Sequence, residues 1–390
     1  MPTQEPYLYK AMGIEQVKNN SSILLMFHCE QNTGYAIETL EKVFHNAAVT
    51  AGYAEENIYW SFKSTSQNTT ENTIACDYKQ PNESLDLKKF IKDKNISVAI
   101  AFDLGFPCPV IGELKEAGVT RLISYWGASM SSINNGLKLA IKRIECLIRK
   151  NKPDVFIFES EAMRLTGTHG RGLSTQETHV VYLGVDTEKF HPNYNSDAYT
   201  YNSLSIPTNR KIIFYSGHME QRKGVRVIIK AAIHLIDQLK LSDFHFVICG
   251  NKNQEADNYK ELLINTKAQD HVTFAGYRND VNLLMRGSNI GVIASTGWDS
   301  FTMSSVEMMA SGLPMIVSNL QGLSETIVHN ENGFLFEPGN EIELANYIAK
   351  LSSDINLAKQ FSQASRLRAT TFFSQNSQIQ GIAAILKDCH

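Results

Sequence analysis

Short apolar runs alternate along the chain with longer segments of helical periodicity, and this alternation occurs in two series. Apolar runs of this length are typical of strands buried in a parallel sheet. The first series predicts strands at 22–29, 96–103, 120–126 and 154–160. The second series predicts strands at 211–217, 244–250, 271–276, 289–295 and 313–318. Strand–helix alternation repeated in this way predicts an α/β protein with two doubly wound domains.

The helical pattern is clearest directly after Gly224, where apolar residues recur every three or four positions. Their stripe consists of Val225, Ile228, Ile229, Ala232, Leu235, Ile236 and Leu239. Two further helices are predicted over 36–50 and 135–150. The segment 193–210 is polar and irregular, which is typical of a connector. We therefore predict a first domain over 1–190, a linker over 191–210 and a second domain over 211–369.

Length and composition agree with this division. A chain of 390 residues is too long for one ordinary core. The net charge of −3 argues against a nucleic-acid partner. The six cysteines are scattered without a C-x-x-C pair, which favours reduced thiols over disulfides or a zinc site. The N-terminus lacks a signal-peptide pattern, and no apolar run approaches the roughly 18 residues of a membrane span. We expect a cytoplasmic protein.

The loop "SGHMEQRKG" (216–224) links a predicted strand to the helix that begins after Gly224. Free N–H groups and the dipole at a helix start favour an anion. Arg222 and Lys223 add full positive charges beside them. The loop is therefore a candidate phosphate site, and the alternative is a solvated, basic helix start.

A second candidate lies in "DSFTMSSVEMMASGLP" (299–314), where a predicted helix begins near Met303. Glu307 stands between apolar neighbours in this helix, and a carboxylate is costly to bury without a partner. Such a group can accept two hydrogen bonds from a vicinal diol, such as that of a ribose. Asp299, one loop earlier, can accept hydroxyls of a neighbouring sugar. The alternative is that Glu307 pairs with a local basic residue.

Further along the edge of the second predicted sheet, Tyr277 and Arg278 follow the strand 271–276. The two side chains together offer a flat surface against which a nucleobase can lie. The alternative is plain loop surface.

Several of these segments match one family pattern in order. The pattern E-x-F-G-x-x-x-x-E-A-x-A-x-G-x-P aligns with Asp299, Phe301, Thr302, Glu307, Met308, Ala310, Gly312 and Pro314. A G-R-x-x-x-x-K-G loop aligns with Gly217, His218, Lys223 and Gly224. The segments "SEAMR" (160–164), "GVDTEKFHP" (184–192) and "NGFLFEPGN" (332–340) also fit. The chain thus resembles the retaining nucleotide-sugar glycosyltransferases of family 4, in glycosyltransferase group 1.

This resemblance implies a GT-B fold, in which two Rossmann-like domains face each other across a deep cleft. It also implies that a C-terminal helix, about 370–390, crosses back to the first domain. The second domain would bind the nucleotide sugar and the first domain the acceptor. No cofactor or metal is expected.

The resemblance also assigns roles to individual residues. Glu307 would hold the ribose, Asp299 would contact the donor sugar, and Lys223 would neutralise the pyrophosphate, which makes these three the candidate catalytic residues. The remaining donor-binding candidates are Gly217, His218, Arg222, Tyr277, Arg278, Phe301, Thr302 and Met303.

Four positions depart from the family pattern. Asp299 replaces a glutamate and is one methylene shorter, and Thr302 replaces a glycine. His218 replaces an arginine, a role that Arg222 can take. In the first domain Trp126 stands before Gly127 where the family has a histidine. An indole can stack on a sugar but cannot transfer a proton.

The turn after the first predicted strand contains Asn32, Thr33 and Gly34. Family members often bind donor phosphate or acceptor at this place. We therefore include these three residues, with Trp126 and Gly127, as candidates for the acceptor side of the cleft.

The helix predicted over 135–150 carries an apolar stripe among basic residues. The stripe consists of Leu137, Ile141, Ile144 and Ile148, and the basic residues are Lys138, Lys142, Arg143, Arg149 and Lys150. Relatives with lipid-linked acceptors use a comparable element on anionic membranes, which would place this protein at the inner face of a membrane. The alternative is a helix whose apolar stripe packs on the sheet.

The expected function is transfer of a sugar, with retention, from a UDP- or GDP-sugar to a saccharide or lipid-linked acceptor in surface polysaccharide or glycoconjugate synthesis. Two alternatives remain open. The departures from the family pattern are also compatible with a nucleotide-sugar-binding or scaffold subunit that has lost turnover. A nucleotide-sugar epimerase or hydrolase of the same fold is the other alternative.

Overall fold

The computed structural model describes residues 21–31, 33–65, 70–78, 80, 83–149, 151–192 and 198–388. The first domain is built on a seven-stranded sheet of order β3-β2-β1-β4-β5-β6-β7 in which all strand pairs are parallel. Its strands are β1 (Ser22–Glu30), β2 (Ile58–Ser64), β3 (Thr73–Ala75), β4 (Ile96–Phe102), β5 (Arg121–Trp126), β6 (Val155–Phe158) and β7 (Thr178–Val180). Its helices are α1 (Tyr35–Ala51), α2 (Glu83–Asp93), α3 (Pro109–Ala117), α4 (Gly136–Ile148) and α5 (Glu161–Leu165).

The second domain is built on a six-stranded parallel sheet of order β10-β9-β8-β11-β12-β13. Its strands are β8 (Lys211–Ser216), β9 (Phe244–Cys249), β10 (Val272–Gly276), β11 (Ile290–Ile293), β12 (Met315–Ser318) and β13 (Gly333–Phe336). Its helices are α6 (Tyr199–Leu204), α7 (Val225–Ile233), α8 (Asp257–Lys260), α9 (Val281–Arg286), α10 (Met303–Ala310), α11 (Glu341–Ser353) and α12 (Ile355–Phe372).

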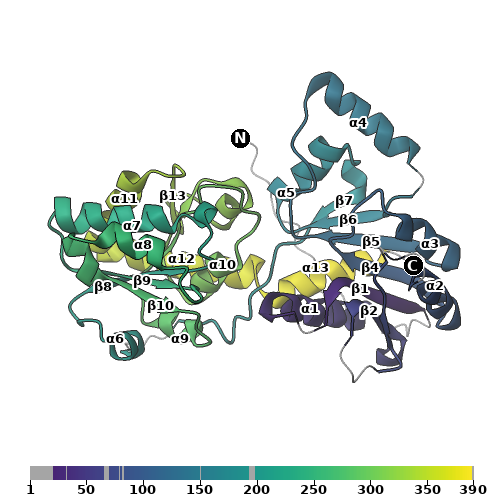
Figure 1. The fold of residues 1–390 in the computed structure, drawn as a ribbon, viewed down its shortest axis with the longest axis horizontal. Coiled ribbons are helices and arrows are strands. Elements are labelled where there is room, and N and C mark those ends of the chain that lie inside the picture. Colours follow the sequence, from purple (N-terminus) through teal and green to yellow (C-terminus); the bar gives the residue numbers. More distant parts are fainter. Residues whose placement is uncertain are drawn as a thin grey trace.

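The two sheets lie in separate domains that the chain connects twice (Figure 1). The first connection leads from β7 through Val185 and Phe190 into the second domain. The second is the passage from α12 to α13 (Gln375–Lys387), which returns to the first domain and packs against α1. The two connections lie side by side, because the N–H of Val185 donates to the carbonyl of Phe373 and the N–H of Gln375 donates to the carbonyl of Val185.

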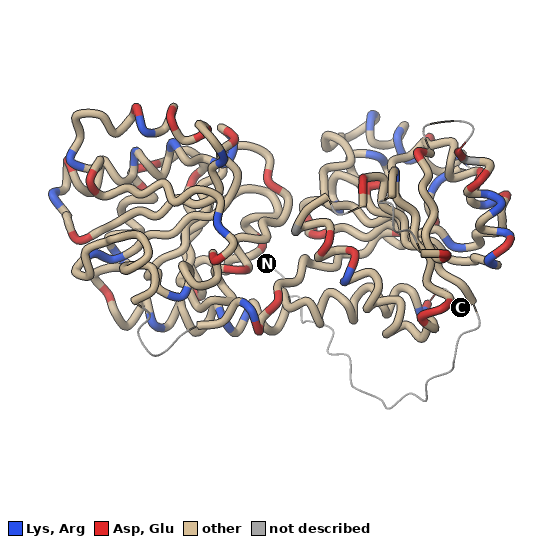
Figure 2. The backbone as a smooth tube through the Cα atoms, turned by 60° about the horizontal axis from the view of Figure 1, so that its bottom comes forward, with Lys and Arg blue, Asp and Glu red and all other residues tan. Residues whose placement is uncertain are grey.

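Each sheet is buried between apolar side chains on both faces, as expected for parallel strands. Ile23, Leu25 and Phe27 of β1 face one cluster together with Ile382 and Leu386 of α13. The alternate positions of β1 face a second cluster under α2 and α3. Figure 2 shows that lysine, arginine, aspartate and glutamate are interspersed over both domains.

The structure confirms every strand predicted from the apolar runs, and within the described residues it adds four. The additional strands are β2, β3, β7 and β13. One prediction is wrong: the segment 193–210 is not irregular throughout, because its described part contains α6. This helix packs against α9, and the Thr200 hydroxyl donates to the carbonyl of Leu284 at 2.9 Å. Helix α6 is thus part of the second domain.

The helix predicted over 135–150 is α4, and its apolar stripe does not pack on the sheet. Leu139 and Cys146 are its buried side chains. The opposite stripe is exposed, and it consists of Leu137, Ile141, Ile144, Leu147 and Ile148, of which each is at least 55% accessible. In Figure 1 α4 projects from the first domain. Among the described residues no helix is both long and apolar enough to cross a membrane.

Gly224 fixes the loop before α7 against the end of β11. Its φ is 72°, and a Cβ atom built there would lie 1.7 Å from the carbonyl oxygen of Ala294. Only glycine tolerates both this left-handed backbone and this approach. The contact places the preceding residue, Lys223, beside the loop that follows β11.

Candidate functional site in the interdomain cleft

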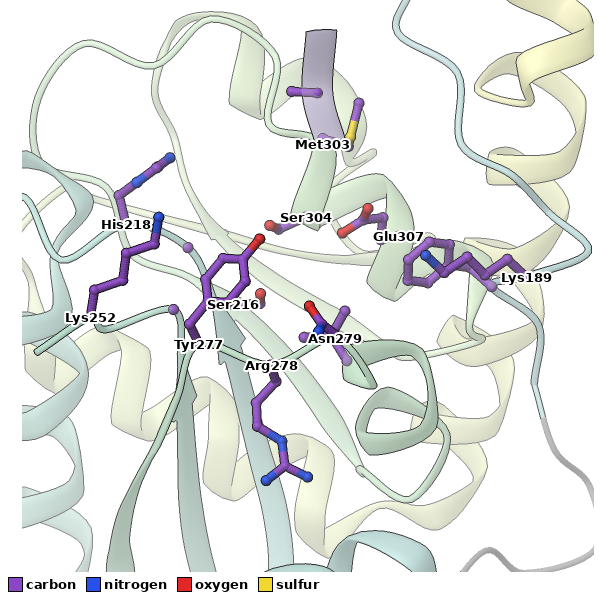
Figure 3. A pocket seen from close by; sticks show the side chains of 15 residues that line it. Lys189, Ser216, His218, Lys252, Tyr277, Arg278, Asn279, Met303, Ser304 and Glu307 are labelled. Carbon is purple, nitrogen blue, oxygen red and sulfur yellow. The ribbon is translucent and has the colours of Figure 1, made fainter. Parts of the chain in front are cut away.

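Three adjoining cavities lie where the carboxyl ends of the two sheets face each other. The Glu307 cavity, of about 340 Å³, is bounded mainly by the second domain and is drawn in Figure 3. The Asp299 cavity has a volume of about 370 Å³, and the Glu159 cavity on the first-domain side has about 250 Å³. Met303 lines all three, so they form one continuous cleft. Ligands of open α/β sheets bind at such edges.

Glu307 is a buried carboxylate that faces an open cavity. Its residue is 6% accessible, and within the described part of the chain no hydrogen bond or ion pair to its carboxylate is found. Burial raises the pKa of Glu307 to about 7, and the nearby charge of Lys189 counteracts part of this rise. In Figure 3 Glu307 and Ser304 project from α10 toward the space that Tyr277 faces from the other side. The group is therefore placed to accept hydrogen bonds from a ligand.

The start of α10 provides hydrogen-bond donors next to Glu307. Met303 and Ser304 line both the Glu307 cavity and the Asp299 cavity, and the first amides of a helix have no carbonyl partner within it. The Oγ1 atom of Thr302 is buried, and among the described residues it has no hydrogen-bond partner, so it does not cap the helix. The partial positive charge at this helix start favours an anion or a hydroxyl.

Lys223 and Asp299 form a buried ion pair. The Lys223 Nζ lies 2.9 Å and 3.0 Å from the two carboxylate oxygens of Asp299. The Ser295 hydroxyl also donates to Asp299 Oδ2 at 2.6 Å. Lys223 and Asp299 both line the Asp299 cavity. The carboxylate of Asp299 therefore orients Lys223, and it keeps fewer free lone pairs for a sugar than the sequence suggested.

Breaking this ion pair should cost stability in a way that depends on both partners. In Lys223→Met the Asp299 side chain, which is 5% accessible, loses its counter-charge, so we expect roughly 3 kcal/mol of destabilisation. Adding Asp299→Asn should recover at least about 1 kcal/mol of this loss. Urea unfolding of the two single variants and the double variant measures the coupling energy. The exposed pair Lys88–Glu116 serves as the control, and it should show coupling below about 1 kcal/mol. Additive losses at Lys223 and Asp299 would contradict this account.

The loop after β8 brings Gly217 and His218 to the boundary between the Glu307 and Asp299 cavities, which both residues line. Gly217 lies close to Gly250, which directly follows β9. A Cβ atom built on Gly250 would lie 2.0 Å from the carbonyl oxygen of Gly217. Arg222 also lines the Asp299 cavity, but its guanidinium is engaged. It donates to the carbonyl of Trp298 at 2.8 Å and pairs with Glu220 at 2.6 Å.

Tyr277 and Arg278 differ in orientation. Tyr277 is 61% accessible, lines the Glu307 cavity and has Lys252 Nζ 4.8 Å from its ring centroid. Arg278 also lines the Glu307 cavity, but its guanidinium is held by a neighbouring acid. Its guanidinium donates twice to Asp280, at 2.7 Å and 2.5 Å, and Figure 3 shows it pointing away from the other labelled side chains. The Tyr277 ring is therefore the exposed flat surface at this edge of the cavity, and the role of Arg278 in donor binding stays a prediction.

Phe301 packs against the two connections between the domains. It borders the Asp299 cavity, but its ring lies 5.3 Å from that of Tyr182 and 5.2 Å from that of Phe373. These residues belong to the two connections between the domains. The side chain therefore stabilises the junction under the cleft.

On the first-domain side, Gly127 lines both the Asp299 and the Glu159 cavity. Trp126 is outside the lining of the three cavities, and its ring packs against the cluster under α2 and α3. Its Nε1 is buried and finds no hydrogen-bond partner in the part of the chain that the structure describes. Gly34 is the residue directly before α1, whose Ala36 lines two of the cavities. The Thr33 hydroxyl donates to the carbonyl of Glu30. Asn32 lies outside the described residues.

Sequence reasoning missed two acids of the cleft, Asp103 and Glu159. Both line the Glu159 cavity, and each follows an apolar strand directly, β4 for Asp103 and β6 for Glu159. That position was the available signal, since ligand sites lie outside the carboxyl ends of such strands. Among the described residues, in the cleft or outside it, no group of three or more His, Cys, Asp or Glu side chains is arranged so that it could hold a metal ion.

The match to a known protein family falls on the second domain. Residues 200–368 match the family model described as glycosyl transferases group 1. The chain is 27% identical over 176 residues to the UDP-Gal:alpha-D-GlcNAc-diphosphoundecaprenol alpha-1,3-galactosyltransferase of Escherichia coli, a match that covers 45% of each chain. The chain spans about half the length of the curated relatives it matches first.

Solved structures resemble the whole chain. A glycosyltransferase from Rickettsia africae has a TM-score of 0.78 at 20% identity, covering 95% of this chain and 99% of that one. HepE of Anabaena, solved in complex with UDP, has a TM-score of 0.73 at 17% identity, covering 94% of this chain and all of that one. At these identities the likeness shows the fold, and the chain has the GT-B architecture of two Rossmann-like domains.

Proposed function

We propose that the protein is a retaining glycosyltransferase of family 4 that transfers a hexose from a nucleotide sugar to a saccharide or lipid-linked acceptor. The observation that carries the proposal is Glu307, a buried carboxylate without a partner in the described residues, at the edge of a cavity beside a helix start. A ribose diol supplies the two hydrogen bonds that this carboxylate lacks. The relatives support the reaction class, since the matched family model and the E. coli relative are glycosyltransferases.

In this proposal the donor extends from the Glu307 cavity into the Asp299 cavity. The base lies near Tyr277, the ribose bonds to Glu307, and the diphosphate meets the first amides of α10. Lys223, oriented by Asp299, offsets the charge that develops on the leaving diphosphate. The HepE neighbour has been solved with UDP and with UDP-glucose, which supports a diphosphate donor of this size.

The proposed transfer needs no metal, because Lys223 and the helix start supply the positive charge. The bond between the anomeric carbon and the phosphate oxygen breaks, and the acceptor oxygen bonds to the same face of that carbon. The acceptor proton leaves with the phosphate. Water is excluded when the domains close over the cleft, which limits hydrolysis of the donor.

The test is to incubate the protein with UDP-glucose, UDP-galactose, GDP-mannose and ADP-glucose, each with a set of methyl glycosides, and to follow products by proton NMR. Transfer that retains the anomeric configuration and persists in EDTA supports the proposal. Free sugar in the absence of any acceptor indicates a hydrolase, and an epimerised donor indicates an epimerase. Binding of a donor without any turnover favours a scaffold subunit. Each of the last three results contradicts the proposed transferase.

We further propose that the exposed stripe of α4 contacts an anionic membrane, which would bring the cleft to lipid-linked acceptors. Ile141 and Ile144 are 55% and 60% accessible, and basic residues flank them on the helix. Amphipathic helices with this arrangement bind anionic lipid through apolar burial and charge together. Surface polysaccharide or glycoconjugate synthesis is the setting in which such acceptors occur.

The double change Ile141→Asp/Ile144→Asp should reduce binding to phosphatidylglycerol vesicles by roughly tenfold or more, because it removes apolar area and adds negative charge. Co-sedimentation with vesicles measures this, and pure phosphatidylcholine vesicles should retain little protein. Leu85→Asp, a change at another exposed apolar residue of the first domain, is the matched control. Equal binding by the wild type and the double variant would refute the membrane role of α4.

A further inference from the structure

The Glu159 cavity combines an apolar wall with two carboxyl groups. Ile37, Leu40 and Val43 of α1 form much of its wall, with Phe102 at the end of β4 and Met303 of α10 closing it toward the second domain. Its acidic members are Asp103 and Glu159, and Thr39 and Gln378 are its other polar side chains. The donor site described above uses none of these polar groups.

The two carboxyl groups converge on Gly127. The Gly127 N–H donates to Asp103 Oδ1 at 3.0 Å. A Cβ atom built on Gly127 would lie 3.1 Å from Glu159 Oε1, so the second acid also lies close to this residue. The absence of a side chain at Gly127 keeps both acids open to the cavity.

Glu159 has few partners for a group that is only 6% accessible. The Tyr125 hydroxyl accepts a hydrogen bond from Gln378 at 2.9 Å and is the one donor toward the Glu159 carboxylate in the described part of the chain. The charged group that acts on Glu159 is Asp103, which is also an acid, and neither of the two forms an ion pair with any described residue. Burial and this like charge raise the pKa of Glu159 to about 8.

Such an arrangement costs folding free energy, since buried acids without a cation are unfavourable. The fold does not require them, because apolar residues would fill the same wall. A ligand that donates hydrogen bonds, or that brings a positive charge, would satisfy them. A ligand with a carboxylate or phosphate at this point would place its negative charge beside Asp103, and beside Glu159 wherever that group is ionised, and be rejected.

We propose that the Glu159 cavity binds the end of the acceptor that receives the sugar, and that Asp103 and Glu159 select an amino sugar over a neutral sugar and a neutral sugar over an anionic one. The proposal rests on the proposed glycosyltransferase function, because it assigns the acceptor side of the same cleft. The cavity adjoins the Asp299 cavity through Gly127 and Met303, so a sugar bound there faces the donor.

The test uses the full chain and three probes, methyl glucosaminide, methyl glucoside and methyl glucuronide, titrated at pH 7 by ligand-observed NMR with and without UDP. The wild type should bind the amino sugar at least ~10-fold more tightly than the uronide, which corresponds to ~1.4 kcal/mol. In Asp103→Asn/Glu159→Gln the ratio should fall below ~3-fold, and Glu116→Gln, a surface acid that is 73% accessible, should keep the wild-type ratio.

The proposal would be overturned if the wild type did not bind the amino sugar most tightly and the uronide most weakly. It would also be overturned if the double variant kept the wild-type ratio of affinities. If the double variant fails to fold, Asp103→Asn alone decides by the same ratio, which should shift toward unity. Titration with UDP, GDP and ADP tests the donor site separately from the Glu159 cavity. Loss of sugar selection with intact nucleotide binding concerns the Glu159 cavity alone, whereas a wild type that selects sugars but binds no nucleotide refutes the donor site and leaves the cavity assignment standing.

Discussion

Replacing Glu307 with alanine should weaken nucleotide binding by roughly 30- to 1000-fold, or about 2–4 kcal/mol. The estimate follows from two hydrogen bonds between a ribose diol and a charged carboxylate, each contributing about 1.5–3 kcal/mol before the cost of removing water. Glu307→Gln keeps one acceptor oxygen and loses the charge, so it should fall between the alanine variant and the wild type. Calorimetric titration with UDP, GDP and ADP measures all three proteins.

The effect can be separated from damage to the fold. Glu307 is buried without a partner in the described residues, so its removal should leave the free energy of unfolding unchanged or higher. Since burial raises the pKa of Glu307 to about 7, wild-type affinity for a UDP-sugar should also decline from pH 8 to pH 6, as the carboxylate is protonated. The alanine variant should lack this decline. Glu331→Ala, at an exposed residue of the same domain, should behave as the wild type, and equal affinity in all variants would remove Glu307 from the site.

Glu159→Gln should raise stability at alkaline pH by roughly 3–5 kcal/mol, an effect that does not depend on any ligand. The pKa of Glu159 is about 8 in the folded protein, against an ordinary value of 4.5. Between these two values the folded state holds a proton that the unfolded state has released, so wild-type stability falls as pH rises. Below about pH 4.5 both states are protonated, and above about pH 8 both are ionised, so the contribution is constant outside this window.

The advantage of the glutamine variant over the wild type should therefore be small at pH 5, grow through pH 7 and level off above pH 8. Urea unfolding at these pH values gives the difference directly. Taking the difference between the variant and the wild type cancels other titrating groups such as Glu307, while Asp103 and Tyr125, which adjoin Glu159, are part of what is measured. Glu116→Gln should give a difference near zero throughout. Parallel stability curves for Glu159→Gln and the wild type would show that Glu159 is not held protonated.

The sequence predicted the architecture well because parallel strands buried on both faces are continuous apolar runs. β1, β8 and β9 are of this kind, whereas β3 and β7 have three residues each and carry no readable period. β2 was missed because its sequence IYWSFKS mixes polar residues into the run. Helix α6 was not predicted because it is stabilised by its packing on α9 and by the Thr200–Leu284 hydrogen bond. The hydrophobic periodicity of its own sequence does not indicate a helix.

The candidate site was predictable where a motif carries the chemistry in one segment. Glu307, Met303 and Lys223 line the cleft as their motifs suggested. Pairings across the chain were not predictable: Lys223 and Asp299 are 76 positions apart, and only the fold brings their side chains together. Arg278 looked free in sequence because nothing there shows that Asp280 turns back to bind it.

The exposed stripe of α4 illustrates the limit of periodicity. The pattern of Leu137, Ile141 and Ile144 predicts a helix with one apolar face, but it does not indicate whether the protein's own core covers that face. The structure buries Leu139 and Cys146 and leaves the stripe outside. This exposed stripe is the observation on which the proposed membrane contact of α4 rests.

The central claim is that a nucleotide diphosphate occupies the Glu307 cavity with its ribose on Glu307. A crystal structure of the protein with the nucleotide that binds most tightly tests it most directly. We predict both ribose hydroxyls within about 2.6–3.2 Å of the Glu307 carboxylate, with the diphosphate at the amides of Met303 and Ser304. A nucleotide bound elsewhere, or one whose ribose turns away from Glu307, would contradict the account.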